Sequence, residues 1–213
     1  MSEDIISGYE TQQLTPAQQT TAYDVFLKGE FIDLIALNED VVKGTNWYKW
    51  FNDAESTQHM QKHYFPNTMT SQLEFLNDLR KNQNKIQLGI VKKDAGRMIG
   101  TISLQSINFF NRNADISILI GEEEGRKLVY AQEAMQLMIE HGFFTLNLHK
   151  IYGGYVQSLE SWGVFLNKRF GFKAEGLWRE HVFKNGKYVD VYRIGLLRSE
   201  YLATIKGEEE HER

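Results

Sequence analysis

The sequence predicts an α/β domain built on one mixed sheet with helices on both faces. Strand-like and helix-like segments follow one another in the order β-α-α-β-β-β-α-β-α-β-β. Hydrophobic residues make up 42% and aromatic residues 13% of the 213 positions, which is enough for a sizeable core and excludes global disorder. The chain contains no cysteine, so disulfide scaffolds, cysteine-ligated zinc and a cysteine nucleophile are excluded.

Charge and hydropathy exclude two further classes. The formal net charge is −4, so there is no overall basic field that would attract a nucleic-acid backbone. No apolar run approaches the roughly 18 residues that a membrane helix needs. The opening MSEDIISGYE lacks the basic and apolar pattern of a signal peptide. We therefore expect a cytoplasmic protein without membrane or nucleic-acid partners.

Three segments are predicted along the chain. Residues 1–28 form a polar arm, because TQQLTPAQQTT is poor in aliphatic residues. Residues 29–204 show neither a linker nor an internal repeat and form the single domain. Residues 205–213, which include GEEEHER, form a charged tail. The arm is either a disordered lead or a segment that docks on a partner protein or on a second copy in a homodimer.

In the first half of the domain, the sequence predicts two single strands, one pair of strands joined by a turn, and two helices. Residues 31–37 alternate as in a strand, and residues 46–60 have helical spacing that places Trp47, Trp50 and Phe51 on one face. A second helix is predicted over 70–81 after Thr/Ser cap candidates. Residues 86–107 read as strand, turn and strand. Residues 114–121, ADISILIG, are nearly continuous in aliphatics, as in a central strand covered on both faces.

The second half contains the strongest helix and a hairpin. Small and apolar residues recur at helical steps over 129–144. A short strand over 149–156 precedes a helix over 161–172, which Gly171 would end. Asn185-Gly186 lies between two strand-like runs and is the strongest short hairpin signal in the sequence.

These elements and several phrases together resemble the GNAT superfamily of N-acetyltransferases. The phrases are WFND at 50–53, IGTIS at 99–103, ADISILIG at 114–121, LNLHKI at 146–151, GFKAEG at 171–176, and REH with KNGKYVD at 179–190. Their order and spacing cover residues 29–201, and they look most like the branch that holds ribosomal-protein N-terminal acetyltransferases and amino-sugar acetyltransferases. The resemblance implies a fold whose central strands splay apart.

The resemblance also implies an acetyl-CoA-dependent transfer to an amine. The pantetheine arm of the co-substrate would pair with the strand residues Ile118, Leu119 and Ile120. Its phosphates would lie on the loop that starts the next helix, where backbone N–H groups and the helix dipole attract anions. The residues of that loop are Arg126, Lys127, Leu128, Val129, Tyr130 and Ala131.

The loop departs from the family pattern at two glycine positions. Lys127 and Val129 stand where glycines let the backbone approach phosphate oxygens. Glu122, Glu123 and Glu124 add negative charge just upstream. We therefore expect weaker or differently posed CoA binding than in a typical family member.

The segment that would approach the thioester departs as well. Glu160 and Gly163 take the positions of an Asn and a Ser in the family pattern, and Asn167 takes that of the tyrosine that protonates the leaving thiolate. An amide is a poor proton donor, so Tyr130, Tyr155 or a water would have to replace it.

Six residues are candidates for the acceptor side. Asp115 heads the splayed strand and is the candidate base, although an Asp there also suits a turn cap. Glu180 and His181 precede the last hairpin in a stretch that lines the acceptor side in the resembling branch, or are ordinary strand-edge residues. Trp47, Trp50 and Phe51 are either a wall of the acceptor site or part of the core.

His59 and His63 could share a helix face, but no third ligand is apparent, so we predict no metal site. The predicted function is direct acetyl transfer from acetyl-CoA to a primary amine, either an amino sugar of a nucleotide sugar or a protein N-terminus. The alternative is a catalytically degenerate member that uses the fold as a binding or structural module.

Overall fold

The structure, a computed structural model, describes residues 23–60 and 64–211 and contains one eight-stranded mixed sheet. The strands lie in the order β1-β2-β3-β4-β5-β6-β8-β7, and only the β5–β6 pair is parallel. They are β1 (Val25–Lys28), β2 (Ile32–Ala36), β3 (Ile86–Lys92), β4 (Arg97–Asn108), β5 (Asn113–Ile120), β6 (Lys150–Val156), β7 (Lys173–Lys184) and β8 (Lys187–Leu197). The predicted fold class is confirmed.

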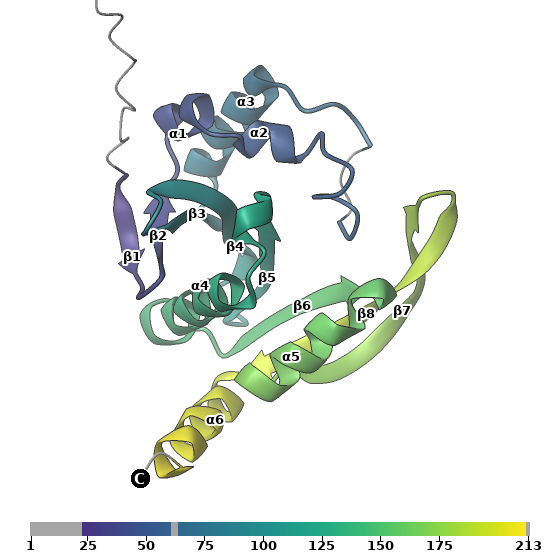
Figure 1. Ribbon diagram of the computed structural model, residues 1–213. Helices are drawn as coiled ribbons and strands as arrows, with labels where there is room; N and C mark the ends of the chain where they lie inside the picture. Colours follow the sequence, from purple (N-terminus) through teal and green to yellow (C-terminus); the bar gives the residue numbers. More distant parts are fainter. Residues whose placement is uncertain (1–22, 61–63, 212–213) are drawn as a thin grey trace, which may run out of the picture.

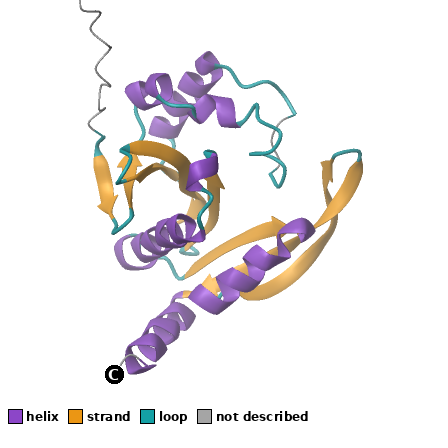
Figure 2. Cartoon of the chain, in the orientation of Figure 1, coloured by secondary structure: helices purple, strands orange, loops and turns teal. Residues whose placement is uncertain are grey.

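Helices cover both faces of the sheet (Figures 1 and 2). The short helices α1 (Glu39–Gly44) and α2 (Trp47–Trp50) gather with α3 (Met69–Lys81) over one face, and α4 (Leu128–Glu140) packs on the other. Neighbouring strand residues divide between two cores: Ile90 joins the α4 side, and Val91 joins Trp47 on the other side. This is the period of two that a sheet buried on both faces requires.

The two central strands separate after a short parallel stretch. Asn113, Ala114 and Asp115 of β5 pair with Lys150, Ile151 and Tyr152 of β6, and no later residue of either strand continues that pairing. Beyond it, β5 stays bonded to β4 as far as Ile120, whereas β6 follows β8. The second half of β5 therefore presents one backbone edge that is not used by the sheet.

The predicted helix C-cap at Gly171 and the predicted hairpin turn at Asn185-Gly186 are both confirmed. The helix α5 (Glu160–Phe170) runs beside β6 and ends at Gly171, whose left-handed φ of 85° gives the predicted C-cap. Asn185 and Gly186 have φ values of 51° and 78° between β7 and β8. Both positive values fit the tight hairpin turn that the sequence indicates.

The helix predicted over 46–60 is wrong beyond its first turn. Only Trp47–Trp50 is helical, and turns follow. Asp53 accepts a hydrogen bond from the Ser56 backbone N–H at 2.6 Å, and the Thr57 hydroxyl donates to the Asp53 carbonyl at 2.7 Å. Short polar side chains here bind the backbone that a helix would use. The short helix α1 was not predicted; Asn38 caps it by accepting from the Val41 N–H at 2.9 Å.

Both ends of the predicted domain extend further than expected. The sheet begins at Val25, inside the range assigned to the arm, while residues 1–22 lie outside the described residues. At the other end, α6 (Arg198–His211) continues through most of the range assigned to a charged tail. No helix in the described ranges is both long enough and apolar enough to cross a membrane.

Candidate functional site

A cavity of about 1300 Å³ passes through the gap where β5 and β6 separate. Ile116 and Ile118, which pack toward α4, line one side. Ser103 and Ser117, which pair across β4 and β5, line it from the opposite face of the sheet. The cavity therefore connects the α4 and α5 side of the sheet with the side covered by α1, α2 and α3. A molecule lying in it would reach both faces.

The open edge of β5 and the start of α4 meet at this cavity. Ile118, Leu119, Ile120, Arg126, Lys127, Leu128 and Ala131 all line it, which brings together seven of the nine residues predicted to bind CoA. The helix α4 begins at Leu128 with Lys127 as its N-cap, so backbone N–H groups of its first turn lie at the cavity wall. This juxtaposition suits an extended chain that ends in an anionic group.

Two predicted loop residues lie elsewhere. Tyr130 is only 7% exposed and belongs to the core on the α4 side, where the Lys92 ammonium lies 5.7 Å from its ring centre. Val129 is partly exposed on the same helical turn and is absent from the lining. The loop glycine that matters sterically is Gly125, where a Cβ would lie 2.8 Å from Cβ of Ile99. The loop thus packs tightly on the sheet one residue before Arg126.

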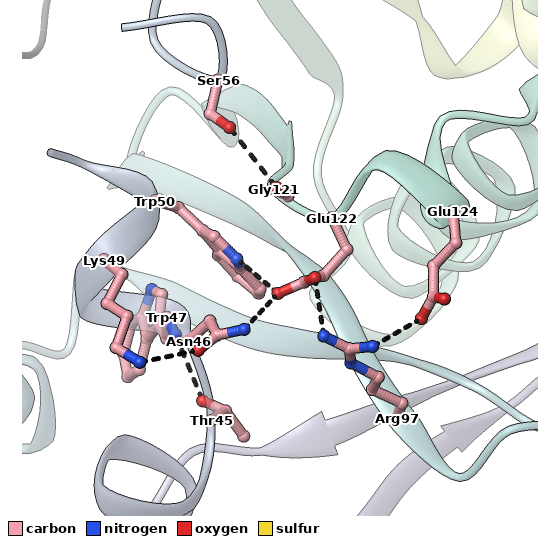
Figure 3. A network of polar contacts seen from close by, with 10 residues as sticks. All are labelled: Thr45, Asn46, Trp47, Lys49, Trp50, Ser56, Arg97, Gly121, Glu122 and Glu124. Atoms are coloured by element: carbon pink, nitrogen blue, oxygen red, sulfur yellow. Dashed lines mark hydrogen bonds and ion pairs between the residues drawn. The ribbon is translucent and has the colours of Figure 1, made fainter. Parts of the chain in front are cut away.

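The acidic run before the loop is largely engaged by other side chains (Figure 3). One carboxylate oxygen of Glu122 accepts from the Trp50 indole at 2.9 Å and from the Asn46 amide at 3.0 Å. The other accepts from the Arg97 guanidinium at 2.9 Å, and Arg97 also pairs with Glu124 at 3.3 Å. Two of the three glutamates are therefore held by one arginine, which lowers their repulsion of a bound anion.

The Arg126 guanidinium is held by an acid from the opposite wall. It forms an ion pair with the Glu55 carboxylate, and both residues line the cavity. The two side chains are partly exposed, at 36% and 66%, so the pair is screened by water and weak. An anionic ligand at the start of α4 would compete with Glu55 for Arg126.

Asp115 lies in the cavity as part of an ion pair. Its carboxylate is 3.4 Å from the Arg193 guanidinium, which also lies over the Trp178 ring at 4.3 Å from the ring centre. Burial raises the pKa of the Asp115 carboxyl, and the opposing effects of Arg193 and Gln105 are smaller. Asp115 therefore combines a held position with a raised proton affinity, as a general base requires.

Tyr155 on β6 also lines the cavity, and Gly163 on α5 makes room for it. A Cβ at Gly163 would collide with the Tyr155 phenol. The ring stacks on Tyr192 at 5.5 Å between centres. Burial, and then Glu160 and Tyr192, raise the pKa of the Tyr155 phenol, so it stays protonated at neutral pH. Of the two tyrosines named from the sequence, Tyr155 alone lines the cavity.

The predicted position of the family acid is occupied differently. Asn167 is exposed and does not line the cavity; its amide donates to the Phe172 carbonyl at 2.7 Å. That hydrogen bond closes the C-terminal end of α5. Asn167 thus has a capping contact and no contact with the cavity.

Of the aromatic residues predicted as an acceptor wall, Phe51 lines the cavity, whereas Trp47 and Trp50 do not. Trp47 is fully buried in the core beneath α1 and α3, and Trp50 holds Glu122. Glu180 is exposed in the irregular part of β7, and His181 packs on Trp178 at 4.6 Å between ring centres. Neither Glu180 nor His181 lines the cavity.

Other polar residues that line the cavity were not identified from the sequence. They form a polar stripe on one face of β3, β4 and β5 and comprise Gln87, Thr101, Ser103, Gln105 and Ser117. The alternation of polar and aliphatic residues in TISLQ at 101–105 was the available signal, because alternate strand residues share a face. His59 accompanies them, with Nδ1 3.0 Å from the Ser158 hydroxyl.

The described residues contain no group of three or more His, Asp or Glu side chains that could hold a metal ion. Of the two histidines considered from the sequence, His63 lies outside the described residues.

Residues 34–158 match the family model described as an acetyltransferase (GNAT) domain. The chain is 30% identical over 156 residues to the spermidine N(1)-acetyltransferase of Vibrio cholerae, which is 72% of this chain and 89% of that protein. It is 29% identical over 155 residues to the N-acetyltransferase p20 of Bacillus licheniformis, covering 72% and 86% of the two chains.

Solved structures agree with these relatives. A crystal structure of spermidine N-acetyltransferase from Vibrio cholerae in complex with CoA and spermine superposes with a TM-score of 0.73 at 25% identity. The match covers 82% of this chain and 99% of that one. The splayed strands, the cavity between them and the family match over more than half of the chain agree, and the chain belongs to the GNAT family of acetyltransferases.

Proposed function

We propose that the protein transfers the acetyl group of acetyl-CoA directly to the primary amine of a small acceptor. The observation that carries the proposal is the cavity between β5 and β6, into which the open β5 edge and the first turn of α4 both face. Pantetheine would pair with the backbone of Ile118, Leu119 and Ile120. The phosphates would lie at the start of α4, near Arg126 and Lys127.

Acetyl transfer needs an amine in its neutral form. An α-amine with a pKa of about 8 is roughly a tenth neutral at pH 7, and a lysine-like amine near 10.4 is mostly charged. We assign Asp115 as the group that accepts the amine proton, because it is buried in the cavity with a raised pKa. Arg193 keeps the carboxylate ionised and in place.

The amine nitrogen then forms a bond to the thioester carbon, and the carbon–sulfur bond breaks. The electron pair leaves on sulfur, which must gain a proton to become the CoA thiol. We assign Tyr155 as the donor, because its phenol lines the cavity while Asn167 does not. The proton lost by the amine and the proton gained by sulfur balance, and solvent restores both side chains.

The proposed acceptor is a class of compounds, the small primary amines. An amino sugar and a protein N-terminus remain the acceptors expected from the sequence, and the printed name of the Vibrio cholerae relative adds polyamines. All three are primary amines, and the polar stripe at Gln87, Ser103 and Ser117 offers hydrogen bonds to any of them.

The proposal is tested by isothermal titration of acetyl-CoA followed by an assay of CoA release with a panel of primary amines. We expect saturable binding, and CoA release that depends on the amine and yields an equal amount of N-acetyl product. Arg126→Ala should weaken binding, whereas Lys43→Gln, on the surface of α1, is the matched control. Failure to bind at millimolar acetyl-CoA would favour the non-catalytic alternative.

A further inference from the structure

A second, smaller pocket of about 440 Å³ adjoins the acceptor end of the large cavity. The two share Gln58, His59, Met60, Val156 and Val182 in their linings. From there the small pocket extends to the turn between β7 and β8, where Lys184, Asn185 and Lys187 line it. We call it the side pocket. It lies where a part of the acceptor remote from the amine would be placed.

The side pocket is lined by cationic and neutral polar side chains together with the apolar side chains of Met60, Val156, Val182 and Val189. Lys184 and Lys187 come from the hairpin, and His59 comes from the segment after α2. No Asp or Glu lines it within the described ranges 23–60 and 64–211. The chain as a whole has a net charge of −4. The side pocket, with two lysines and no acid in its described lining, is therefore positively charged on a negatively charged chain. Such a surface attracts anions and repels polycations.

Contacts within the described residues hold the Lys184 ammonium in place. The Lys184 ammonium donates to the Met60 carbonyl at 3.2 Å and lies 5.6 Å from the centre of the Tyr64 ring. The Tyr64 hydroxyl donates to the Phe183 carbonyl at 3.0 Å. Met60 and Tyr64 are therefore each tied to the hairpin. An ammonium fixed in this way loses little further freedom when it meets an anion.

His59 is poised to respond to an anion. Burial, and then the charge of Lys184, lower the pKa of its imidazole. Its Nδ1 is 3.0 Å from the Ser158 hydroxyl, and when that hydroxyl donates, the ring proton sits on Nε2. A bound anion would offset the repulsion from Lys184 and raise the proton affinity of the ring.

The large cavity shows the same excess of cations. Glu55 and Asp115 are the acids in its described lining, and each is paired with an arginine of that lining. Lys85 and Lys127 add further positive charge. Each acid in the described lining therefore already has an arginine as its partner. A polyamine would meet net positive charge along the whole path.

We propose that the side pocket binds a phosphate group of the acceptor, so that the substrate is a primary amine that also carries a phosphate ester. Lysine ammonium groups with neutral hydroxyl and amide donors are a common phosphate-binding set. That the acceptor is an amine rests on the proposed function. That an anion binds here rests only on the residues of the side pocket. It distinguishes this chain from the relatives whose names specify spermidine.

The first test measures anion binding without turnover. Inorganic phosphate is titrated into the full chain with saturating CoA present, so that the site for CoA phosphates is already filled. The His59 ring resonances should shift saturably, and its pKa should rise. Lys187→Gln and Lys184→Gln should each weaken phosphate binding at least about fivefold, since hydrogen bonds to charged groups are the strong ones. Lys43→Gln should leave it unchanged. Absence of a saturable shift, or equal weakening in the control, overturns the proposal.

The second test compares acceptors that differ only in phosphate. Glucosamine, glucosamine 6-phosphate, a nucleoside-diphosphate-linked hexosamine and spermidine are assayed with acetyl-CoA. At least one phosphorylated amine should have a KM at least about tenfold below that of glucosamine, as expected for charge-assisted hydrogen bonds. The two phosphorylated arms distinguish a sugar monoester from a nucleotide sugar. Lys187→Gln should remove the advantage, whereas Lys43→Gln, remote from both pockets, should keep it.

The outcomes separate the two proposals. Turnover of glucosamine or spermidine in preference to both phosphorylated amines overturns the phosphate site and leaves the acetyltransferase intact. A chain that binds no acetyl-CoA overturns the proposed function, and the phosphate titration of the apo chain then still decides the side pocket.

Discussion

The phenol of Tyr155 on β6 occupies the space that a side chain at Gly163 on α5 would fill. This contact links one departure from the family pattern, Gly163, to the tyrosine that could replace the missing family acid, because a glycine at 163 admits the Tyr155 ring to the cavity. A helix-interior glycine ordinarily costs about 1 kcal/mol relative to alanine. Gly163 therefore lowers the intrinsic stability of α5 but makes room for the Tyr155 ring.

Gly163→Ala should displace Tyr155 and lower kcat. Despite the better helix propensity of alanine, we expect the free energy of unfolding to fall by roughly 1–3 kcal/mol, as in other overpacked sites. Urea denaturation and steady-state kinetics measure the two effects. In the double variant with Tyr155→Ala, stability should recover relative to Gly163→Ala while activity stays low. Equal stability losses with and without the tyrosine would refute the steric link.

Tyr155→Phe should lower kcat by about a hundredfold and change the KM for acetyl-CoA little, because a positioned general acid typically contributes about 10²–10⁴. The matched control is Tyr192→Phe, which keeps the stacked ring but alters the neighbouring phenol. If both variants retain full kcat, water rather than Tyr155 protonates the leaving thiolate.

The pH dependence of transfer should reveal Asp115. Its carboxyl must be ionised to accept a proton, and burial raises its pKa. The rate should therefore fall as the pH is lowered, with the acid limb above the ordinary range for Asp. Arg193 lowers that pKa, so Arg193→Gln should move the acid limb to higher pH. If neither Arg193→Gln nor Asp115→Asn moves the acid limb of the pH–rate profile, that limb belongs to the acceptor amine and not to Asp115.

Glu55→Gln should tighten CoA binding. The Glu55 carboxylate holds the Arg126 guanidinium that the phosphates would otherwise engage. An exposed ion pair is worth about 0.2–1 kcal/mol, so the gain should be roughly 1.4- to fivefold. Calorimetry with CoA measures it, and Glu39→Gln on α1 provides a control with an equally exposed ion pair remote from the cavity. Weaker binding in Glu55→Gln would contradict the assignment of Arg126.

Glu122→Ala should destabilise the fold by roughly 1–3 kcal/mol, the cost of leaving a buried donor unpaired. The Trp50 indole and the Asn46 amide both donate to one oxygen of this carboxylate, whose side chain is 14% exposed (Figure 3). Glu122→Gln retains an acceptor oxygen and should lose less. Thermal and urea denaturation measure the stability of both variants. Glu123→Gln is the control, because the Glu123 carboxylate is not part of this network. Equal stability of all three would refute a structural role for Glu122.

The fold could be predicted because its signals are local. Gly171 ends α5 and Asn185-Gly186 turns the last hairpin, and each depends on a backbone conformation that few residues adopt. The strands β3, β4 and β5 are read from runs of aliphatic residues. The helix expected over 46–60 failed because Asp53 and Thr57 bind nearby backbone groups, a competition that hydrophobic spacing does not register.

The site could be predicted only in part, for a related reason. Ile118 and Arg126 could be placed from the order of motifs along the chain in the resembling family, and both line the cavity. The ion pair of Arg126 with Glu55 joins residues 71 positions apart, and no local pattern in the sequence indicates it. The side pocket likewise joins His59 to Lys184 across the chain. Long-range pairings of charges depend on the tertiary fold and become visible only there.

The most direct test of the central claim is a crystal structure of the full chain with CoA. The account predicts pantetheine along the open backbone edge of β5, phosphates at the start of α4, and the sulfur within hydrogen-bonding distance of the Tyr155 hydroxyl. CoA bound outside the gap between β5 and β6, or a sulfur remote from Tyr155, would contradict it.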